Sequence, residues 1–487
     1  MSHFEPRSAA RPHPDAPMVD IADYLVDRTI DSTEAFDTAR YVLLDSLACA
    51  ALAMDHTECV KHLGPLVPGA VLPGGARVPF TAHELDPAQA AYNIGVQIRW
   101  LDFNDTWLAA EWGHPSDNLG AILAVADYLG RLAEARGDAA MTVRDVLGHA
   151  IRAHEIQGCY ALRNAFNRVG LDHVILVRLA STAVATRMFG GDKDEIVNAI
   201  SHSWIDNGAL RTYRHAPNTG PRKSWAAGDA CRRAVVHALN AMKGVVGYPS
   251  ALSVPTWGFY DVAFRGEAFA FERPFGTYVM ENILFKISYP AEFHAQTAVE
   301  CAMALHDEVA PRVRAQGVDA IDRIVIETQQ AGMRIIDKTG PLSNYADRDH
   351  CIQYMVAVPL LFGRLTADDY GDAVAADPRI DALRDRTQVR ENPDFTRDYF
   401  DPDKRFIGNS VQVFFADGTA TQKVSIDYPV GHRRRRAQGI GLLMEKFERA
   451  VRMKLPAGQA DELLALAARP EELEVISITR LMAMLRV

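Results

Sequence analysis

The sequence has few cysteines and no long apolar segment. Its six cysteines are dispersed over 487 residues, and no two have the C-x-x-C spacing of zinc ribbons or local iron–sulfur sites. Dispersed cysteines in a long chain are typical of a reducing compartment, so we expect a cytoplasmic protein. The chain has no run of about 18 apolar residues, which predicts that no helix spans a membrane.

Several catalytic and nucleotide-binding motifs are also absent from the sequence. The chain contains no G-x-S-x-G elbow, no G-x-x-x-x-G-K-[ST] loop, no H-E-x-x-H helix and no G-x-G-x-x-G that follows a predicted strand. Its histidines do not have the spacing of metal ligands. The sequence therefore predicts a site with neither a metal nor a cofactor.

Basic residues are fewer than acidic ones, 52 against 62, and the formal net charge is −10. Binding to nucleic acid or to an anionic membrane needs a broad surface of Lys and Arg, so we expect neither as a partner. Hydrophobic residues make up 48% of the chain, which is typical of a globular protein and leaves a small molecule as the expected ligand.

The length of the chain predicts more than one hydrophobic core. Apolar residues recur at helical spacing through the first half, and a stretch rich in Gly, Pro and aromatic residues, 248–278, interrupts this pattern. We therefore expect a mainly α protein with a smaller α+β domain. The predicted units are a flexible N-terminal tail (1–17), an all-helical domain (18–275), an α+β domain (276–431) and C-terminal helices that return to the helical domain (432–487).

Capping and turn residues set the expected element boundaries. The Asp31-Ser32 and Ser116-Asp117 pairs precede predicted helices, and Asp417-Gly418 is a strong hairpin turn signal. The region 368–403 is predicted as a charge-rich loop with short helix. The other expected elements are helices over 33–54, 118–132, 172–189, 224–243 and 290–306, a strand over 321–328, and hairpin strands over 410–415 and 422–428.

The segment Arg211–Lys223 concentrates positive charge in an acidic protein. It contains no acidic residue, and its prolines and Gly220 prevent a continuous helix. A rigid cationic loop within an apolar, helix-rich chain favours a pocket for a small polyanion. Its candidate ligand-binding side chains are Arg211, Tyr213, Arg214, His215, Arg222 and Lys223.

Four polar side chains fall near predicted helix starts: His114, His173, Lys223 and His294. Helix N-termini present unpaired N–H groups and partial positive charge, so an anion could bind where several of them meet. Each residue also has a purely structural interpretation, as a local cap, a buried hydrogen-bonded histidine or an exposed lysine. Asp102 has the same alternative, because acids commonly cap helices and turns.

Long motifs in the chain resemble those of the MmgE/PrpD family. The resemblance extends over nearly the whole chain after the N-terminal tail. The motifs are DFNDTW at 102–107, HPSDNLG at 114–120, GLDH at 170–173, LRTYRHAPNTG at 210–220, KSWAAGD at 223–229, FKISYPAEFH at 285–294, DRDHCIQY at 347–354 and GHRRRR at 431–436.

The resemblance implies a helical domain with a lid-like α+β domain, a homodimer, and catalysis without a metal or an iron–sulfur cluster. It also implies dehydration of 2-methylcitrate to 2-methyl-cis-aconitate during propionate breakdown. Other reactions on the same scaffold stay open, namely decarboxylation of cis-aconitate, dehydration of citrate, hydration of cis-aconitate and epimerisation of a dicarboxylate. A tricarboxylate-binding protein without catalysis is a further alternative. The positions that match a related decarboxylase branch are Asp102, Thr106, His114, His173, Lys223 and His294.

The expected chemistry requires a base, an acid and cations that hold carboxylates. We hypothesise that His114 and His173 form the acid–base pair, in either order, because imidazoles titrate near neutral pH. Lys223 would act with them by holding a carboxylate, and Asp102 would orient His114 or the departing hydroxyl. Substrate binding would involve Thr106, Arg211, Tyr213, Arg214, His215, Arg222 and His294.

Overall fold

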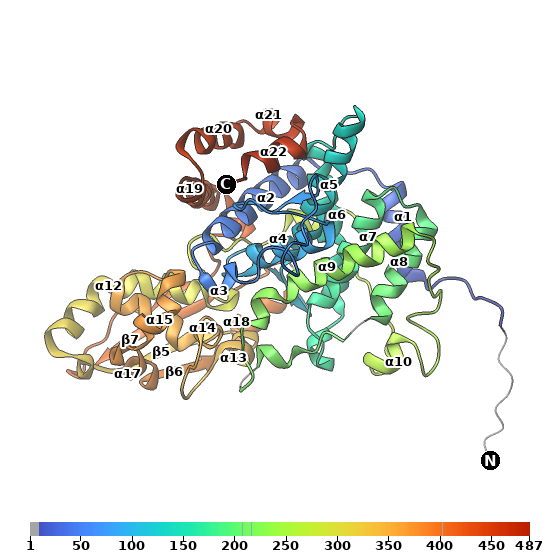
Figure 1. The fold of residues 1–487 in the computed structure, drawn as a ribbon. Coiled ribbons are helices and arrows are strands. Elements are labelled where there is room, and N and C mark those ends of the chain that lie inside the picture. Colours follow the sequence, from blue (N-terminus) through green and yellow to red (C-terminus); the bar gives the residue numbers. More distant parts are fainter. Residues whose placement is uncertain (1–8, 207, 216, 402) are drawn as a thin grey trace, which may run out of the picture.

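A computed structural model describes residues 9–206, 208–215, 217–401 and 403–487. The first eight residues of the predicted tail lie outside this range. Most of the described chain is helical, and a smaller part contains a four-stranded sheet (Figure 1). The predicted fold class, mainly α with a smaller α+β part, is confirmed. Within the described residues, no helix has the length and apolar character needed to cross a membrane.

The first half of the chain is built from helices that share one hydrophobic core. Two short antiparallel hairpins interrupt them, β1–β2 and β3–β4. The helices are α1 (Ala16–Asp27), α2 (Thr33–Ala53), α3 (Thr57–Val60), α4 (Pro87–Arg99), α5 (Leu119–Arg136), α6 (Val143–Arg163), α7 (Val174–Met188), α8 (Lys193–Ile205), α9 (Arg222–Met242), α10 (Phe259–Ala263) and α11 (Tyr278–Glu281). The hairpin strands are β1 (Ala76–Arg77), β2 (Glu84–Leu85), β3 (Trp107–Leu108) and β4 (Trp112–Gly113).

The second domain has a separate core beneath a four-stranded sheet of order β6-β5-β7-β8. The central strand β5 pairs in parallel with β6 and antiparallel with β7, and α12 and α15 pack together beside the sheet. The strands are β5 (Ile321–Thr328), β6 (Thr387–Glu391), β7 (Asn409–Phe415) and β8 (Val424–Ile426). The helices are α12 (Gln296–Gln316), α13 (Gln330–Ile336), α14 (Tyr345–Arg348), α15 (Ile352–Phe362), α16 (Asp372–Ala375), α17 (Pro378–Asp385) and α18 (Pro393–Phe400).

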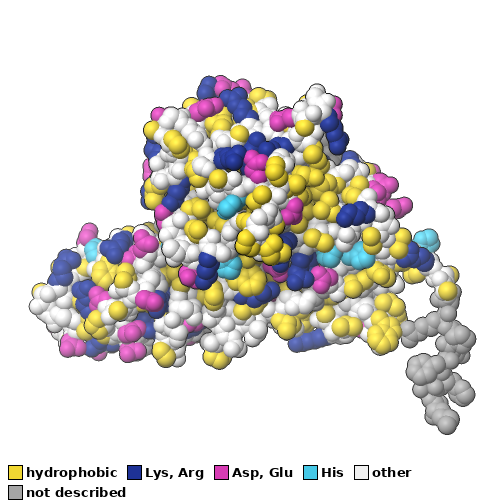
Figure 2. Space-filling model, viewed as in Figure 1, with side chains coloured by type: hydrophobic (Ala, Val, Ile, Leu, Met, Phe, Trp, Pro, Cys, Tyr) yellow, Lys and Arg dark blue, Asp and Glu magenta, His cyan; other side chains and the backbone are white. Residues whose placement is uncertain are grey.

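The C-terminal helices lie on the first half of the chain, above the second domain in Figure 1. Leu443 and Phe447 belong to the same buried cluster as Leu43 and Leu47, so α19 and α2 share one core. The helices of this segment are α19 (Arg436–Lys454), α20 (Ala457–Ala467), α21 (Pro470–Val475) and α22 (Ile478–Met484). On the face in Figure 2, basic and acidic side chains are interspersed, so this face has no broad basic surface.

Several local predictions differ from the structure. The tail is shorter than predicted, because Asp15 binds the backbone N–H of Leu252 and α1 begins at Ala16. Residues 290–292 are not helical, because a 3₁₀ turn, η4 (Phe293–Ala295), precedes α12. Strand β6 falls within the predicted loop 368–403, since its polar, largely exposed residues lack the apolar alternation of a strand.

The predicted caps differ in outcome. Ser32 accepts a hydrogen bond from the N–H of Ala35 at the start of α2. Ser116 and Asp117 instead lie inside a 3₁₀ turn, η1 (Pro115–Asn118), and neither caps α5. The strand over 321–328 and the hairpin with its Asp417-Gly418 turn are confirmed, although β8 is shorter than its predicted range.

Three glycines allow α4, α5 and α9 to cross at backbone contact. A Cβ on Gly95 would lie 2.8 Å from the Cα of Gly228, and one on Gly120 would lie 2.9 Å from the Cα of Gly95. A Cβ on Gly228 would lie 2.5 Å from the carbonyl oxygen of Tyr92. Because no side chain separates these helices, the C-terminus of α4 and the starts of α5 and α9 are held close to one another.

We expect Gly228→Ala to lower the free energy of unfolding by about 1–3 kcal/mol, because the added methyl group overlaps the backbone of α4. Thermal unfolding measures this change. Gly441→Ala is the matched control within α19, because a Cβ there meets nothing within 4 Å. The control should raise stability by about 0.5–1 kcal/mol. A Gly228→Ala midpoint at or above that of the wild type would contradict the close crossing.

Candidate active site

A buried pocket lies where the helical half and the second domain meet. The helical half contributes the loop after α4, the β3–β4 hairpin, the start of α7 and the 3₁₀ turn η3 (Arg211–Arg214). The segment before α12 and His350, just before α15, complete the walls. The predicted residues that line it are Asp102, Thr106, His114, His173, Arg211, Arg214 and His215. The remaining predicted residues, Tyr213, Arg222, Lys223 and His294, lie behind or outside this wall.

Asp102 is the central anion of the pocket. Its backbone has a positive φ of 50°, a conformation that Asp tolerates better than most residues and that often marks functional sites. Three cations surround the carboxylate. Arg99 Nη1 lies 2.8 Å from it, Lys286 donates a hydrogen bond to it, and Lys223 Nζ lies 3.5 Å away. Although burial opposes ionisation, these cations hold the pKa of Asp102 well below its usual value. Asp102 therefore stays charged.

Lys223 connects Asp102 to the second domain. Its buried ammonium lies 2.5 Å from Asp349 Oδ2 and 3.2 Å from His350 Nδ1. Asp102, Asp349 and His350 have potential ligand atoms within 4.8 Å of one another, a spacing suited to a cation. The ammonium of Lys223 contacts all three side chains, so a protein side chain supplies positive charge at this position.

His114 has a defined tautomer. Its Nδ1 lies 2.6 Å from the backbone oxygen of Asp105, and because a carbonyl oxygen only accepts, Nδ1 carries the proton. Burial, together with the positive charges of Arg99 and Lys286, holds the pKa of His114 well below its usual value. The neutral ring therefore has an unprotonated Nε2, which lies 3.8 Å from Asp102 Oδ1.

His173 lies beside His114 at the start of α7. The two ring centroids are 5.6 Å apart, and burial lowers the pKa of His173 well below its usual value. Within the described residues, neither ring nitrogen of His173 has a hydrogen-bond partner, and the nearest carboxylate is Asp172, at 3.5 Å. Buried polar atoms normally have partners, so this ring is available to a ligand.

Arg211 and Arg214 are held by acids beneath the pocket. Arg214 donates to both oxygens of Asp172, whereas Arg211 Nη1 is 3.4 Å from Glu111 Oε1. Burial raises the pKa of Glu111 to about 7, against the opposing effect of Arg211. Near neutral pH, Glu111 is thus partly protonated and compensates the charge of Arg211 only in part. His215 accepts a hydrogen bond from Arg211 Nε at 3.2 Å.

The other predicted residues have different surroundings. Arg222 stacks on Trp225 with its side chain 44% exposed, away from the pocket. Tyr213 is partly buried, and its ring lies beside Arg214 and near Asp172. His294 is fully buried and hydrogen-bonds Tyr399, at 3.1 Å, and a pocket residue, Glu292, at 2.9 Å.

Sequence reasoning missed several polar residues of the site. Lys286 carried a recognisable signal, because it is the single charge in the apolar stretch 283–287 and such a lysine is buried only with a partner. Asp349 and His350 lie within a family motif but have no separate sequence signal. The missed residues are Arg99, Glu111, Lys286, Glu292, Asp349 and His350.

Comparisons with known proteins agree with this architecture. The MmgE/PrpD N-terminal domain matches residues 19–272, and the MmgE/PrpD C-terminal domain matches residues 289–471. The chain belongs to the MmgE/PrpD family.

Its relatives within that family include three named for one reaction. The 2-methylcitrate dehydratase of Salmonella typhimurium is 59% identical over 470 residues, 96% of each chain. That of Cupriavidus necator is 59% identical over 98% of each chain. The mitochondrial 2-methylcitrate dehydratase of Yarrowia lipolytica is 56% identical, over 94% of this chain and 88% of its own.

We expect Asp102→Asn to lower the free energy of unfolding by about 3–5 kcal/mol, because it leaves buried cations without their counter-charge. Thermal unfolding measures the loss. Asp381→Asn is the control, because Asp381 also pairs with an arginine three residues away but is 64% exposed. Its loss should be about 0–1 kcal/mol. Equal losses in the two variants would contradict the central role of Asp102.

Proposed function

We propose that the protein is a hydro-lyase that removes water from 2-methylcitrate to form 2-methyl-cis-aconitate, a step of the methylcitrate cycle in propionate breakdown. The observation that carries the proposal is the pair of neutral imidazoles, His114 and His173, in a pocket that also contains Arg211, Arg214 and Lys286. The relatives named 2-methylcitrate dehydratase support the choice of substrate.

The reaction needs both cations and a base. The proton to be removed lies on the methyl-bearing carbon, next to a carboxylate that is already negative. Its removal adds charge to that carboxylate, so the transition state forms readily only where cations are already in place. Arg211 is suited to holding one carboxylate, because it lines the pocket and both of its ion pairs are long, 3.4 Å to Glu111 and 3.9 Å to Asp172. Lys286 also lines the pocket and adds positive charge beside Asp102.

Within this proposal, His114 is the general base. The hydrogen bond from its Nδ1 to the carbonyl of Asp105 leaves the lone pair on Nε2 free to take the proton. His173 donates a hydrogen bond from its neutral ring to the departing hydroxyl, since this ring has no partner among the described residues, and the proton taken up by His114 passes to that hydroxyl to form water. Asp102 then stabilises the imidazolium that forms on His114, and Lys223 positions Asp102 from behind.

Three accompanying expectations stay predictions. The reaction should proceed without a metal, because Arg99, Lys223 and Lys286 supply the positive charge around Asp102. A homodimer and a cytoplasmic location are the other two, and the family resemblance and the dispersed cysteines are their support.

Turnover by chelator-treated protein tests the reaction and its metal independence together. We expect 2-methylcitrate to give an alkene that absorbs in the ultraviolet, at the same rate before and after treatment. Citrate and cis-aconitate serve as comparison substrates, with release of CO₂ followed in parallel. Release of CO₂ from cis-aconitate without dehydration of 2-methylcitrate would contradict the proposed reaction and indicate a decarboxylase instead. Activity that returns only when a divalent cation is restored would contradict metal independence.

We expect His114→Ala to lower kcat by at least about 10²–10⁴-fold, the usual contribution of a general base. Steady-state kinetics with 2-methylcitrate measures the change. His306→Ala is the matched control, because its Nδ1 also bonds a backbone carbonyl, that of Leu360 at 3.1 Å, but it lies outside the pocket. Turnover near the wild-type rate in His114→Ala would show that His114 is not the general base.

The pKa of His114 gives an expectation for the pH profile. A base acts only when unprotonated, and the pKa of His114 lies well below the ordinary value of about 6.5. We therefore expect kcat/KM to stay level as the pH falls through about 6.5 and to decrease only at lower pH. An acid limb with its midpoint at or above about 6.5 would contradict a neutral His114.

A further inference from the structure

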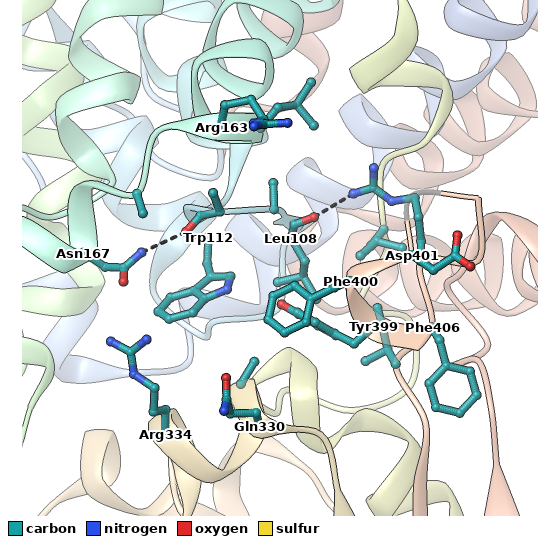
Figure 3. Close-up of a pocket in the computed structure, with 18 of the residues that line it drawn as sticks. Leu108, Trp112, Arg163, Asn167, Gln330, Arg334, Tyr399, Phe400, Asp401 and Phe406 are labelled. Atoms are coloured by element: carbon teal, nitrogen blue, oxygen red, sulfur yellow. Dashed lines mark hydrogen bonds between the residues drawn. The ribbon is translucent and has the colours of Figure 1, made fainter. Parts of the chain in front are cut away.

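A second, larger pocket lies next to the catalytic pocket (Figure 3). Its free volume is about 280 Å³, and we call it the outer chamber. One side comes from the β3–β4 hairpin and the end of α6, and the other from α13 and the end of α18. Figure 3 shows Arg334 and Gln330 approaching from the second domain, with Arg163 and Asn167 on the opposite side. The chamber therefore opens along the boundary between the domains.

The charge of the outer chamber opposes that of the protein. In the part of the chain that the structure describes, the lining contains four arginines, Arg163, Arg168, Arg334 and Arg405, but only two acids, Glu272 and Asp401. Arg163 has a carboxylate within reach, Glu272 at 3.9 Å. Arg405 donates only to neutral oxygens, the backbone oxygen of Leu108 and the hydroxyl of Tyr278.

The two arginines on opposite sides of the chamber have no ion-pair partner. Among the residues that the structure describes, neither Arg168 nor Arg334 has a side-chain ion pair, and both are exposed. They lie on different domains and line the same space. A carboxylate is the group whose geometry best satisfies a planar guanidinium. Positive charge without a counter-charge in a recess attracts small anions and raises their local concentration.

A thin wall separates the outer chamber from the catalytic pocket. Leu108 and Trp112 line both spaces, and they pack with Leu284, Phe293 and Ile407 in one small cluster. Behind this wall His294 joins the two sides. It hydrogen-bonds Glu292, which lines the catalytic pocket, and Tyr399, which lines the outer chamber.

We propose that the outer chamber is a second binding site for a polycarboxylate, distinct from the catalytic pocket, and that it concentrates this ligand beside that pocket. Arg168 and Arg334 bind carboxylates from opposite sides, and the rings of Trp112, Tyr399 and Phe400 contact the apolar part of the ligand. The class of ligand rests on the proposed function, because the substrate of that reaction is a tricarboxylate. The chamber itself is defined by its own charge and shape.

Calorimetry with tricarballylate tests the second site without turnover. This tricarboxylate has no hydroxyl group and cannot be dehydrated. We expect two binding events in the wild type and one in the double variant Arg168→Gln/Arg334→Gln. The double variant Arg136→Gln/Arg314→Gln is the matched control, because both arginines are exposed and neither lines the chamber. One event of equal affinity in all three proteins would overturn the proposal, whatever reaction the enzyme catalyses.

Kinetics gives an independent readout. In the Arg168→Gln/Arg334→Gln variant, kcat/KM should fall about tenfold at low salt, the lower end of electrostatic effects on association. Its kcat should stay within about twofold, because these arginines lie outside the catalytic pocket. The salt dependence of kcat/KM should also weaken, whereas the control should match the wild type. A variant that matches the control in kcat/KM and in salt dependence would overturn the proposal.

Discussion

The buried charge of Asp102 is the constraint on which the pocket depends. Three cations approach it from separate parts of the chain: Arg99 at the end of α4, Lys223 in the first turn of α9, and Lys286 in the segment before α12. Buried charges are costly unless each is paired, so none of these four side chains can move away without leaving a buried charge unpaired. Lys223 also pairs with Asp349, and the same network therefore ties the second domain to the first.

Burial and the nearby cations set the protonation states on which the proposed chemistry relies. Burial, together with Arg99 and Lys286, lowers the pKa of His114, and burial, together with Arg214 and Arg211, lowers that of His173, so both imidazoles are neutral near pH 7. Positive charge that keeps a base unprotonated also attracts a polycarboxylate. The glycine crossing of α4, α5 and α9 makes the arrangement possible, because it brings the helix ends close together.

Much of the local structure could be predicted from short-range signals. Ser32 marks a helix start because its side chain accepts a hydrogen bond from one of the first free N–H groups, and it does so in the structure. Strand β6 could not be predicted, because its polar residues are ordered by backbone pairing with β5 rather than by burial. The site shows a similar division. Arg222 and Lys223 are adjacent in sequence, but the helix directs one to the surface and the other into the Asp102 network.

The sequence by itself determined the helical class, the family and the presence of histidines and cations suited to a polycarboxylate, because each of these is carried by local motifs. Only the tertiary structure decided which cations face the ligand and which are neutralised. Lys286 meets Asp102 across 184 residues, and Lys223 meets Asp349 across 126. The tautomer of His114 likewise depends on the carbonyl of Asp105 approaching its ring. Charge compensation and proton position are set by spatial neighbours, and no local pattern in the chain specifies them.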